Sequence, residues 1–240
     1  MKIVEKIKAK QADIYNAPPV TIGFLGDSVT QGCFEIYKTG PESLQTVFEP
    51  KHAYSTKLRE MLALLFPNVQ INIINSGISG DSAPNGAKRL TRDILPYHPD
   101  LVVVSYGLND SGGGEAGIQK YADALASIFD QLTSQGIEVI FLTENMMNTN
   151  VSCHITDPMF LRIAEDLAKR QNSGLLDRYF DAAKETAAAH GVTVCDCYAK
   201  WKLMAAAGVN VTELLANKVN HPIRELTTLF AYSLLETMLS

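Results

Sequence analysis

The sequence predicts an α/β fold, a three-layer α/β/α sandwich around a parallel sheet of about five strands. Short runs rich in Val and Ile alternate with longer stretches of helical period, the pattern of repeated βαβ units. The strands read as continuous apolar runs, as expected for flavodoxin-like strands covered by helices on both faces. A chain of 240 residues suits one such domain, residues 1–240, with residues 1–18 as an N-terminal helical extension.

The expected elements alternate along the whole chain. Each strand is a short run containing at least one Val, and the strands are Val20–Leu25, Val69–Asn75, Leu101–Ser105, Glu138–Leu142 and Thr193–Cys195. Apolar residues recur at helical spacing in Tyr54–Phe66, Ala83–Ile94, Ile118–Gln135, Leu175–His190 and Glu225–Leu239. The segments 33–52 and 148–158 are expected to be loops that form either a lid or a subunit contact. In the second case the protein is a homo-oligomer.

Composition excludes several classes of protein. The net charge is −5 and no Lys/Arg cluster occurs, so no nucleic-acid partner is expected. The first 19 residues lack the continuous apolar run of a secretory signal, and no later segment is apolar enough for a membrane span. We therefore expect a cytoplasmic protein. Cys195 and Cys197 form a Cys-x-Cys pair, but no second Cys/His pair lies at zinc spacing, so neither a metal nor another cofactor is expected.

Ligands of open parallel sheets bind at the carboxyl ends of the strands. Polar and small residues follow four of the expected strands, in Gly26–Ser28, Ser76–Gly80, Tyr106–Asp110 and Thr143–Asn148. Turns between strands and helices use such residues in any case, so each junction alone has a structural explanation. Their occurrence at four junctions favours a functional site at this edge.

Ser28 is the candidate nucleophile, because it stands where the first strand stops. A hydroxyl needs a base within hydrogen-bond reach, and His is the usual one. His98 and His190 precede strands and so lie at the opposite edge, whereas His52 and His154 remain possible bases. His221 follows the fifth strand, just before the last helix, from where a loop can return it to the first strand.

These residues lie in motifs that resemble the GDSL, or SGNH, hydrolases, a family of GDSL-like lipases, acylhydrolases and esterases. Four blocks carry the resemblance in the family's order, and they are Phe24–Thr30 with Gly-Asp-Ser, Asn75–Gly77, Gly107–Asp110 and Asn220–Pro222. The triplet Gly-Asp-Ser alone is a weak signal, but four ordered blocks at the expected strand ends are specific. The resemblance implies the SGNH hydrolase fold over the whole chain and carboxylic ester hydrolysis.

Carried over by position, the resemblance makes Ser28 the nucleophile and His221 its base. It makes the backbone N–H groups of Ser28 and Gly77 and the side-chain amide of Asn109 the oxyanion hole, which stabilises the charge of the tetrahedral intermediate. Many family members carry Asp three residues before the histidine, where this chain has Lys218. Asn217 or a backbone carbonyl is the expected partner of the ring N–H, which leaves a Ser–His dyad.

The remaining polar residues of the junctions are candidates for turn capping or for substrate binding. Asp27 and Asp110 are explained best as turn caps, although Asp27, Asn145 and Asn148 stay candidate substrate-binding residues along the cleft wall. The expected function is hydrolysis of a small-molecule ester, with a short acyl group such as acetyl on a carbohydrate favoured because no long apolar loop predicts an acyl tunnel. Lysophospholipase and thioesterase activity are the alternatives within the family.

Two alternatives come from other classes. A Mg²⁺-dependent phosphatase would use Asp27, with Asp110 and Glu144 as further carboxylates, but the other strand ends offer Gly and Asn. A binding protein that has lost catalysis would explain the missing Asp, but the joint presence of the four motif residues argues against it.

Overall fold

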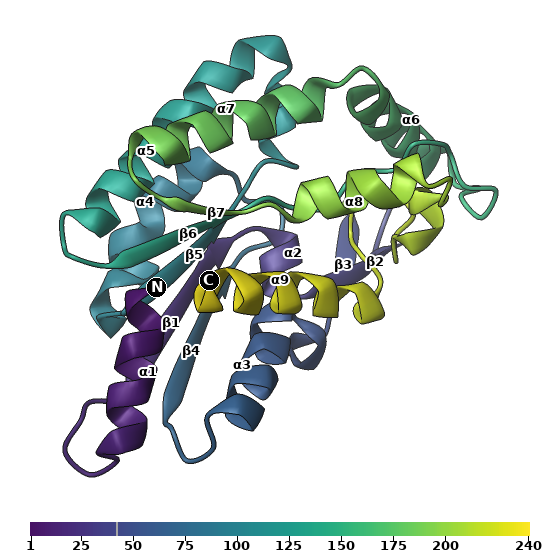
Figure 1. Ribbon diagram of the computed structural model, residues 1–240. Helices are drawn as coiled ribbons and strands as arrows, with labels where there is room; N and C mark the ends of the chain where they lie inside the picture. The colour runs from purple at the N-terminus through teal and green to yellow at the C-terminus, as the bar shows by residue number, and fades with distance from the viewer. Residues whose placement is uncertain (42) are drawn as a thin grey trace.

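The computed structural model describes residues 1–41 and 43–240, and its centre is a five-stranded parallel sheet (Figure 1). The strands are β1 (Val20–Gly26), β4 (Ile71–Gly77), β5 (Leu101–Ser105), β6 (Glu138–Leu142) and β7 (Thr193–Cys195), in the spatial order β4-β1-β5-β6-β7. The predicted α/β/α fold is confirmed. β1 and β4 extend to Gly26 and Gly77, which pair in register, so both motif glycines end strands.

Helices cover both faces of this sheet, as the apolar strands predict. One face carries α1 (Lys2–Ala12), α3 (Tyr54–Leu65) and α9 (Thr227–Leu239), and the other carries α4 (Ala83–Asp93), α5 (Ile118–Thr133) and α7 (Leu175–Ala189). α1 belongs to the same core, because Ile3 and Ile7 are fully buried. Every residue of β1 and β5 is buried, so these two central strands form a rigid floor for the turns that follow them.

Further elements lie around the carboxyl ends of the strands. They are α2 (Ser28–Gln31), α6 (Pro158–Asn172), α8 (Cys197–Ala206) and the single turns of 3₁₀ helix η1 (Pro50–His52), η3 (Asp110–Gly113), η4 (Glu115–Gly117), η5 (Val211–Leu214) and η6 (Arg224–Leu226). The turn η2 (Leu95–Tyr97) precedes β5 and lies at the amino ends instead. α6 follows the expected loop 148–158. It begins at Pro158 because Asp157 accepts hydrogen bonds from the N–H groups of Met159 and Phe160.

The expected loop 33–52 contains an antiparallel hairpin, which corrects the sequence prediction. Its strands are β2 (Cys33–Lys38) and β3 (Leu44–Phe48), and they form a sheet separate from the main one. Neither strand is an apolar run, because exposure rises along β2 toward the turn and no residue of β3 is fully buried, so the rule for buried parallel strands does not detect them. Figure 1 shows the hairpin beside α2, at the carboxyl edge of the main sheet.

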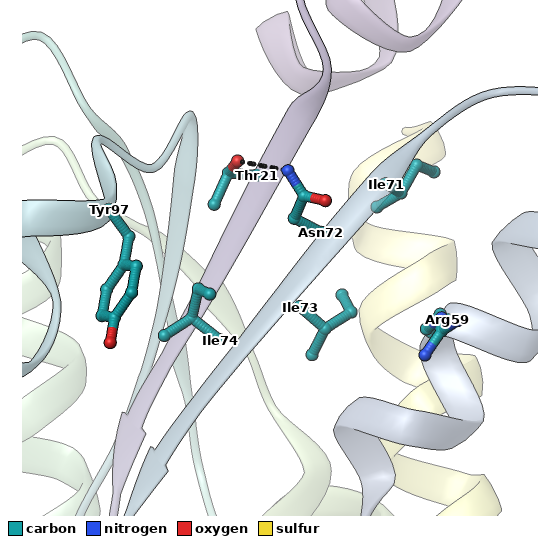
Figure 2. Close-up of a pocket in the computed structure, with 7 residues that line it drawn as sticks. All are labelled: Thr21, Arg59, Ile71, Asn72, Ile73, Ile74 and Tyr97. Atoms are coloured by element: carbon teal, nitrogen blue, oxygen red, sulfur yellow. Dashed lines mark hydrogen bonds between the residues drawn. The ribbon is translucent and has the colours of Figure 1, made fainter.

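A surface pocket of about 390 Å³ lies along the edge strand β4, as Figure 2 shows. Its lining consists of Thr21, Arg59, Ile71, Asn72, Ile73, Ile74 and Tyr97. Asn72 donates a hydrogen bond to Thr21 at the start of the two strands, 3.2 Å away. None of the motif residues lines this pocket. Among the described residues, no helix is both long and apolar enough to cross a bilayer.

Candidate active site

The nucleophile turn, residues 26–29 with the candidate nucleophile Ser28, begins where β1 ends. Asp27 accepts a hydrogen bond at Oδ1 from the N–H of Val29 (2.9 Å), which caps α2 and makes Ser28 its first residue. Gly26 permits the turn, because a Cβ there would lie 2.1 Å from Thr30 Oγ1 and 2.7 Å from the Ser105 carbonyl oxygen. The turn places the Ser28 side chain at the carboxyl edge, as the sequence predicts.

His221 lies directly against Ser28. Its Nε2 is 2.9 Å from Ser28 Oγ, and its Nδ1 is 2.8 Å from the carbonyl oxygen of Phe34 in β2. A carbonyl oxygen can only accept, so the Nδ1 carries the ring hydrogen and Nε2 is left as the acceptor for the serine hydroxyl. This is the tautomer that a general base needs.

Asn217 is not the partner of the His221 ring, which corrects one of the two expectations for that role. Its Oδ1 instead accepts the backbone N–H groups of Val219 (3.1 Å), Asn220 (2.9 Å) and His221 (2.9 Å). The Asn217 side chain therefore shapes the loop that carries the histidine. Lys218, at the position where many relatives have Asp, has a φ of 60° and forms an ion pair with Glu213.

Burial controls the charge of His221. Removal from water lowers the pKa of the imidazole to about 4, although the hydrogen bond to the Phe34 carbonyl and the charge of Glu35 both act to raise it. The ring is therefore neutral across the physiological range. A neutral imidazole can accept the serine proton, and the nearby Glu35 carboxylate favours the imidazolium that results.

The three expected oxyanion donors differ in how free they are. Among the described residues, no acceptor is found for the Ser28 N–H. The Gly77 N–H donates to Asn75 Oδ1 (3.0 Å), and Asn109 Nδ2 donates both to Asp27 Oδ2 and to the Asp81 carbonyl oxygen, each at 2.9 Å. A substrate oxygen would have to compete with Asn75 at one donor and with these two acceptors at another.

Asp27 and Glu144 form a buried acidic pair beneath the nucleophile turn. Burial raises the pKa of Asp27 to about 6, although a hydrogen bond with Glu144 acts to lower it. Burial also raises the pKa of Glu144 well above its ordinary value, and the charge of Asp27 raises it further. Glu144 Oε2 accepts the N–H of Leu108 (2.9 Å). Asp27 is thus a cap and an Asn109 partner, and the contacts of its side chain are to the protein itself.

Asn145 and Asn148 do not line the cleft, which corrects their expected place in substrate binding. Both side chains are fully buried. Asn145 Nδ2 donates to the carbonyl oxygens of Met146 (2.8 Å) and Asn220 (2.7 Å), and Asn148 Nδ2 donates to those of Asn150 (3.1 Å) and Ala164 (2.8 Å). Asn145 therefore ties the segment after β6 to the loop that carries the histidine.

Arg89 is a buried cation that the sequence did not single out. Its guanidinium donates to the carbonyl oxygens of Gly26 (2.9 Å) and Ser76 (2.7 Å), the residues that precede the nucleophile turn and Gly77. It also pairs with Asp81 at 2.7 Å, and Asp81 accepts from Tyr106. The ends of β1 and β4 are thereby joined through one side chain.

The other histidines lie apart from Ser28. His190 contacts Asp130 (2.7 Å) and His98 ends η2, both at the amino edge as predicted from their positions before strands. His52 lies 3.5 Å from Glu49, and His154 lines a pocket with Glu35. Within the described ranges, no three His, Cys, Asp or Glu side chains are placed to hold one metal ion.

The comparisons agree with this architecture. The model of the GDSL-like lipase/acylhydrolase family matches residues 24–225, so the chain belongs to that family. It is 31% identical over 87 residues to an acetylxylan esterase from Geobacillus stearothermophilus, a match that spans 36% of this chain and 38% of that protein. The aligned region is thus well under two thirds of this relative.

Two solved structures share the fold. A gut microbial diltiazem-metabolizing enzyme has a TM-score of 0.67 at 21% identity, with 91% of this chain and 46% of that chain covered. An acetyl-xylooligosaccharide esterase from Geobacillus, solved as a mutant, has a TM-score of 0.67 at 19% identity, with 91% and 94% covered. At such identities the likeness demonstrates the common fold.

Proposed function

We propose that the protein hydrolyses carboxylic esters with Ser28 as nucleophile and His221 as general base. The single observation that carries this proposal is the chain of contacts from Ser28 Oγ to His221 Nε2 (2.9 Å) and from Nδ1 to the Phe34 carbonyl oxygen (2.8 Å). The contacts fix both the distance for proton transfer and the tautomer that accepts the proton. Family membership supports the same reaction class.

The reaction follows from these positions. Ser28 Oγ forms a bond to the carbonyl carbon of the ester while its proton passes to His221 Nε2. The carbonyl oxygen becomes an oxyanion and accepts a hydrogen bond from the Ser28 N–H, with the N–H of Gly77 and the side-chain amide of Asn109 as further donors. Collapse breaks the bond to the alcohol oxygen, which leaves with the proton from Nε2. Water then attacks the acyl-serine with His221 again as base, and the acid is released.

We favour a short acyl group, acetyl on a carbohydrate, as the substrate. This choice is supported by one aligned relative, an acetylxylan esterase, and by one structural neighbour, an acetyl-xylooligosaccharide esterase. A pocket of about 360 Å³ beside Glu35 supports it as well. Its lining combines Asp157, Asn217 and Lys218 with Ile36 and Phe160, and polar groups next to an apolar ring suit a sugar.

The first test compares p-nitrophenyl acetate hydrolysis by the wild type, Ser28→Ala, His221→Ala and Asn217→Ala, with EDTA present throughout. We expect loss of the base to lower the rate by about 10²–10⁴-fold and loss of the nucleophile to leave background only. Asn217→Ala should retain more activity than His221→Ala, because the hydrogen bonds of the Asn217 side chain go to backbone groups and to the Asn220 side chain and not to the His221 ring. Wild-type activity that persists in Ser28→Ala would refute the nucleophile.

The second test concerns the substrate. Acetate, butyrate and octanoate esters of p-nitrophenol are compared, and acetate release from acetylated xylo-oligosaccharides is measured. The proposal expects the acetate ester to turn over fastest and the oligosaccharide to be deacetylated. Faster turnover of the octanoate would favour a lysophospholipase or a long-chain thioesterase instead.

A further inference from the structure

We propose that Arg224 and Glu35 are positioning residues for the general base, because they fix the Phe34 carbonyl against the His221 ring. The inference rests on the proposed Ser28–His221 chemistry. It assigns to an ion pair the task that a triad carboxylate performs in relatives with Asp before the histidine, and neither residue touches the reacting atoms.

The acceptor of the ring hydrogen lies in an irregular stretch of β2. Cys33 pairs with Phe48 and Ile36 pairs with Thr46, and the register shifts between these two pairs. Phe34 and Glu35 therefore lie at a bulge, where the ladder of backbone hydrogen bonds does not define the direction of each carbonyl. The hairpin is also separate from the main sheet. Something besides strand pairing has to hold the Phe34 carbonyl at 2.8 Å from Nδ1.

Arg224 supplies that restraint. Its Nη1 and Nη2 donate to the two oxygens of Glu35 at 2.6 and 2.8 Å, a bidentate pair, and Nη2 also donates to Glu49 at 2.6 Å. Its guanidinium carbon lies 4.5 Å from the centre of the Phe34 ring. Arg224 thus binds the residue that bears the carbonyl and the residue after it. Because it follows His221 by three positions, the same loop carries both the ring and the restraint.

The same groups set the charge around the base. Hydrogen bonds from Arg224 lower the pKa values of Glu35 and Glu49, so both stay ionised. The Glu35 charge raises the pKa of His221 against the effect of burial. Lys51 and His52 are the other charged or titratable groups that act on Glu49. Loss of Glu35 should therefore lower the pKa of His221, and loss of Arg224 should lower it as well, because Glu35 is then less fully ionised where His221 titrates.

The experiment measures kcat, KM and the pH dependence of kcat/KM for p-nitrophenyl acetate in Arg224→Gln, Arg224→Lys and Glu35→Gln. The control is Arg178→Gln, because Arg178 lies in α7, on the face of the sheet opposite to α9, and forms an exposed ion pair with Glu115. Thermal unfolding is recorded for every variant. Wild type and His221→Ala are measured alongside, so that an inactive wild type, or an active His221→Ala, counts against the proposed function separately.

We expect Arg224→Gln to lower kcat by about 10–10²-fold, the cost of a misplaced catalytic group, with KM changed much less. The acid limb of its kcat/KM profile should move to lower pH, because Glu35 loses the cation that keeps it ionised, and the limb of Glu35→Gln should move to lower pH as well. Arg224→Lys should recover part of kcat and the wild-type limb, since it keeps the charge without the fork. Arg178→Gln should match the wild type.

Unchanged kcat in both Arg224→Gln and Glu35→Gln, while His221→Ala is inactive, would overturn the inference and leave the proposed function intact. Lower kcat that follows the loss of thermal stability, with no displacement of either acid limb, would also overturn it, because that outcome is a purely structural role. If Arg224→Gln does not fold, Glu35→Gln still decides the question through its kcat and its acid limb.

Discussion

Replacement of Gly77 by Ala tests the close approach on which the proposed oxyanion hole depends. A Cβ at this position would lie 2.3 Å from Gln31 N, 2.7 Å from Gln31 Cα and 2.8 Å from the Asp27 carbonyl oxygen. All three atoms belong to the backbone around α2, so no side chain can rotate away. An ordinary contact starts at 3.4 Å, and the end of β4 must therefore move from α2 by about 1 Å.

A shift of this size should affect both activity and stability. Misplacement by about 1 Å costs on the order of 10²-fold in kcat/KM, and overpacking costs about 1–3 kcal/mol in the free energy of unfolding. The assay is p-nitrophenyl acetate hydrolysis together with urea unfolding.

The matched control is Gly136→Ala. Unlike Gly77, Gly136 has a positive φ, 74°, but an added Cβ there would meet no atom within 4 Å. It should lower stability by about 1–2 kcal/mol through backbone strain while leaving kcat/KM nearly unchanged. A Gly77→Ala variant with wild-type kcat/KM would refute the assignment of Gly77 to the site.

Two further predictions concern pH. Because burial lowers the pKa of His221 to about 4, kcat/KM should stay on its plateau at pH 5.5, where an ordinary histidine would be only about a tenth neutral. The assay follows p-nitrophenol release at its isosbestic wavelength. A fall in kcat/KM with a midpoint near pH 6.5 would contradict the burial argument. Burial raises the pKa of Asp110 to about 7, above its unfolded value, so its contribution to stability is complete at acid pH and is lost as pH rises from about 4 through 7. Asp110→Asn should reduce the fall in melting temperature between about pH 4 and pH 7, because the amide side chain has no proton to lose and its oxygen can still accept the N–H of Ala83 (3.0 Å). An unchanged dependence of melting temperature on pH would contradict this.

The sheet and the edge that carries the site were predictable because burial on both faces forces apolar composition on a strand. β5, β6 and β7 have the predicted bounds for this reason. The hairpin of β2 and β3 was not predictable in the same way, since its half-exposed strands carry Glu35, Tyr37 and Lys38 among apolar residues. Its position over the site depends on tertiary contacts that local sequence does not encode.

The pairing of Ser28 with His221 was predictable from motif order and from the edge rule. The partner of the ring was narrowed to two options, and sequence could not separate them. A side-chain partner has a residue type that can be searched for, whereas the Phe34 carbonyl is a main-chain atom that every residue possesses. Asn145 and Asn148 show the converse problem, because Asn after a strand satisfies backbone groups as readily as it faces a ligand.

The contacts of Arg89 have a consequence for how the site opens. Separation of the Gly26 and Ser76 carbonyls would leave a buried guanidinium with unpaired donors, and a buried donor left without its partner costs about 1–3 kcal/mol. Local fluctuations that part the ends of β1 and β4 are therefore rare. The hydrogen-bonded amide protons of β1, which is buried along its whole length, should therefore exchange with solvent only when the sheet unfolds, so this strand belongs to the slowest-exchanging cooperative unit of the protein.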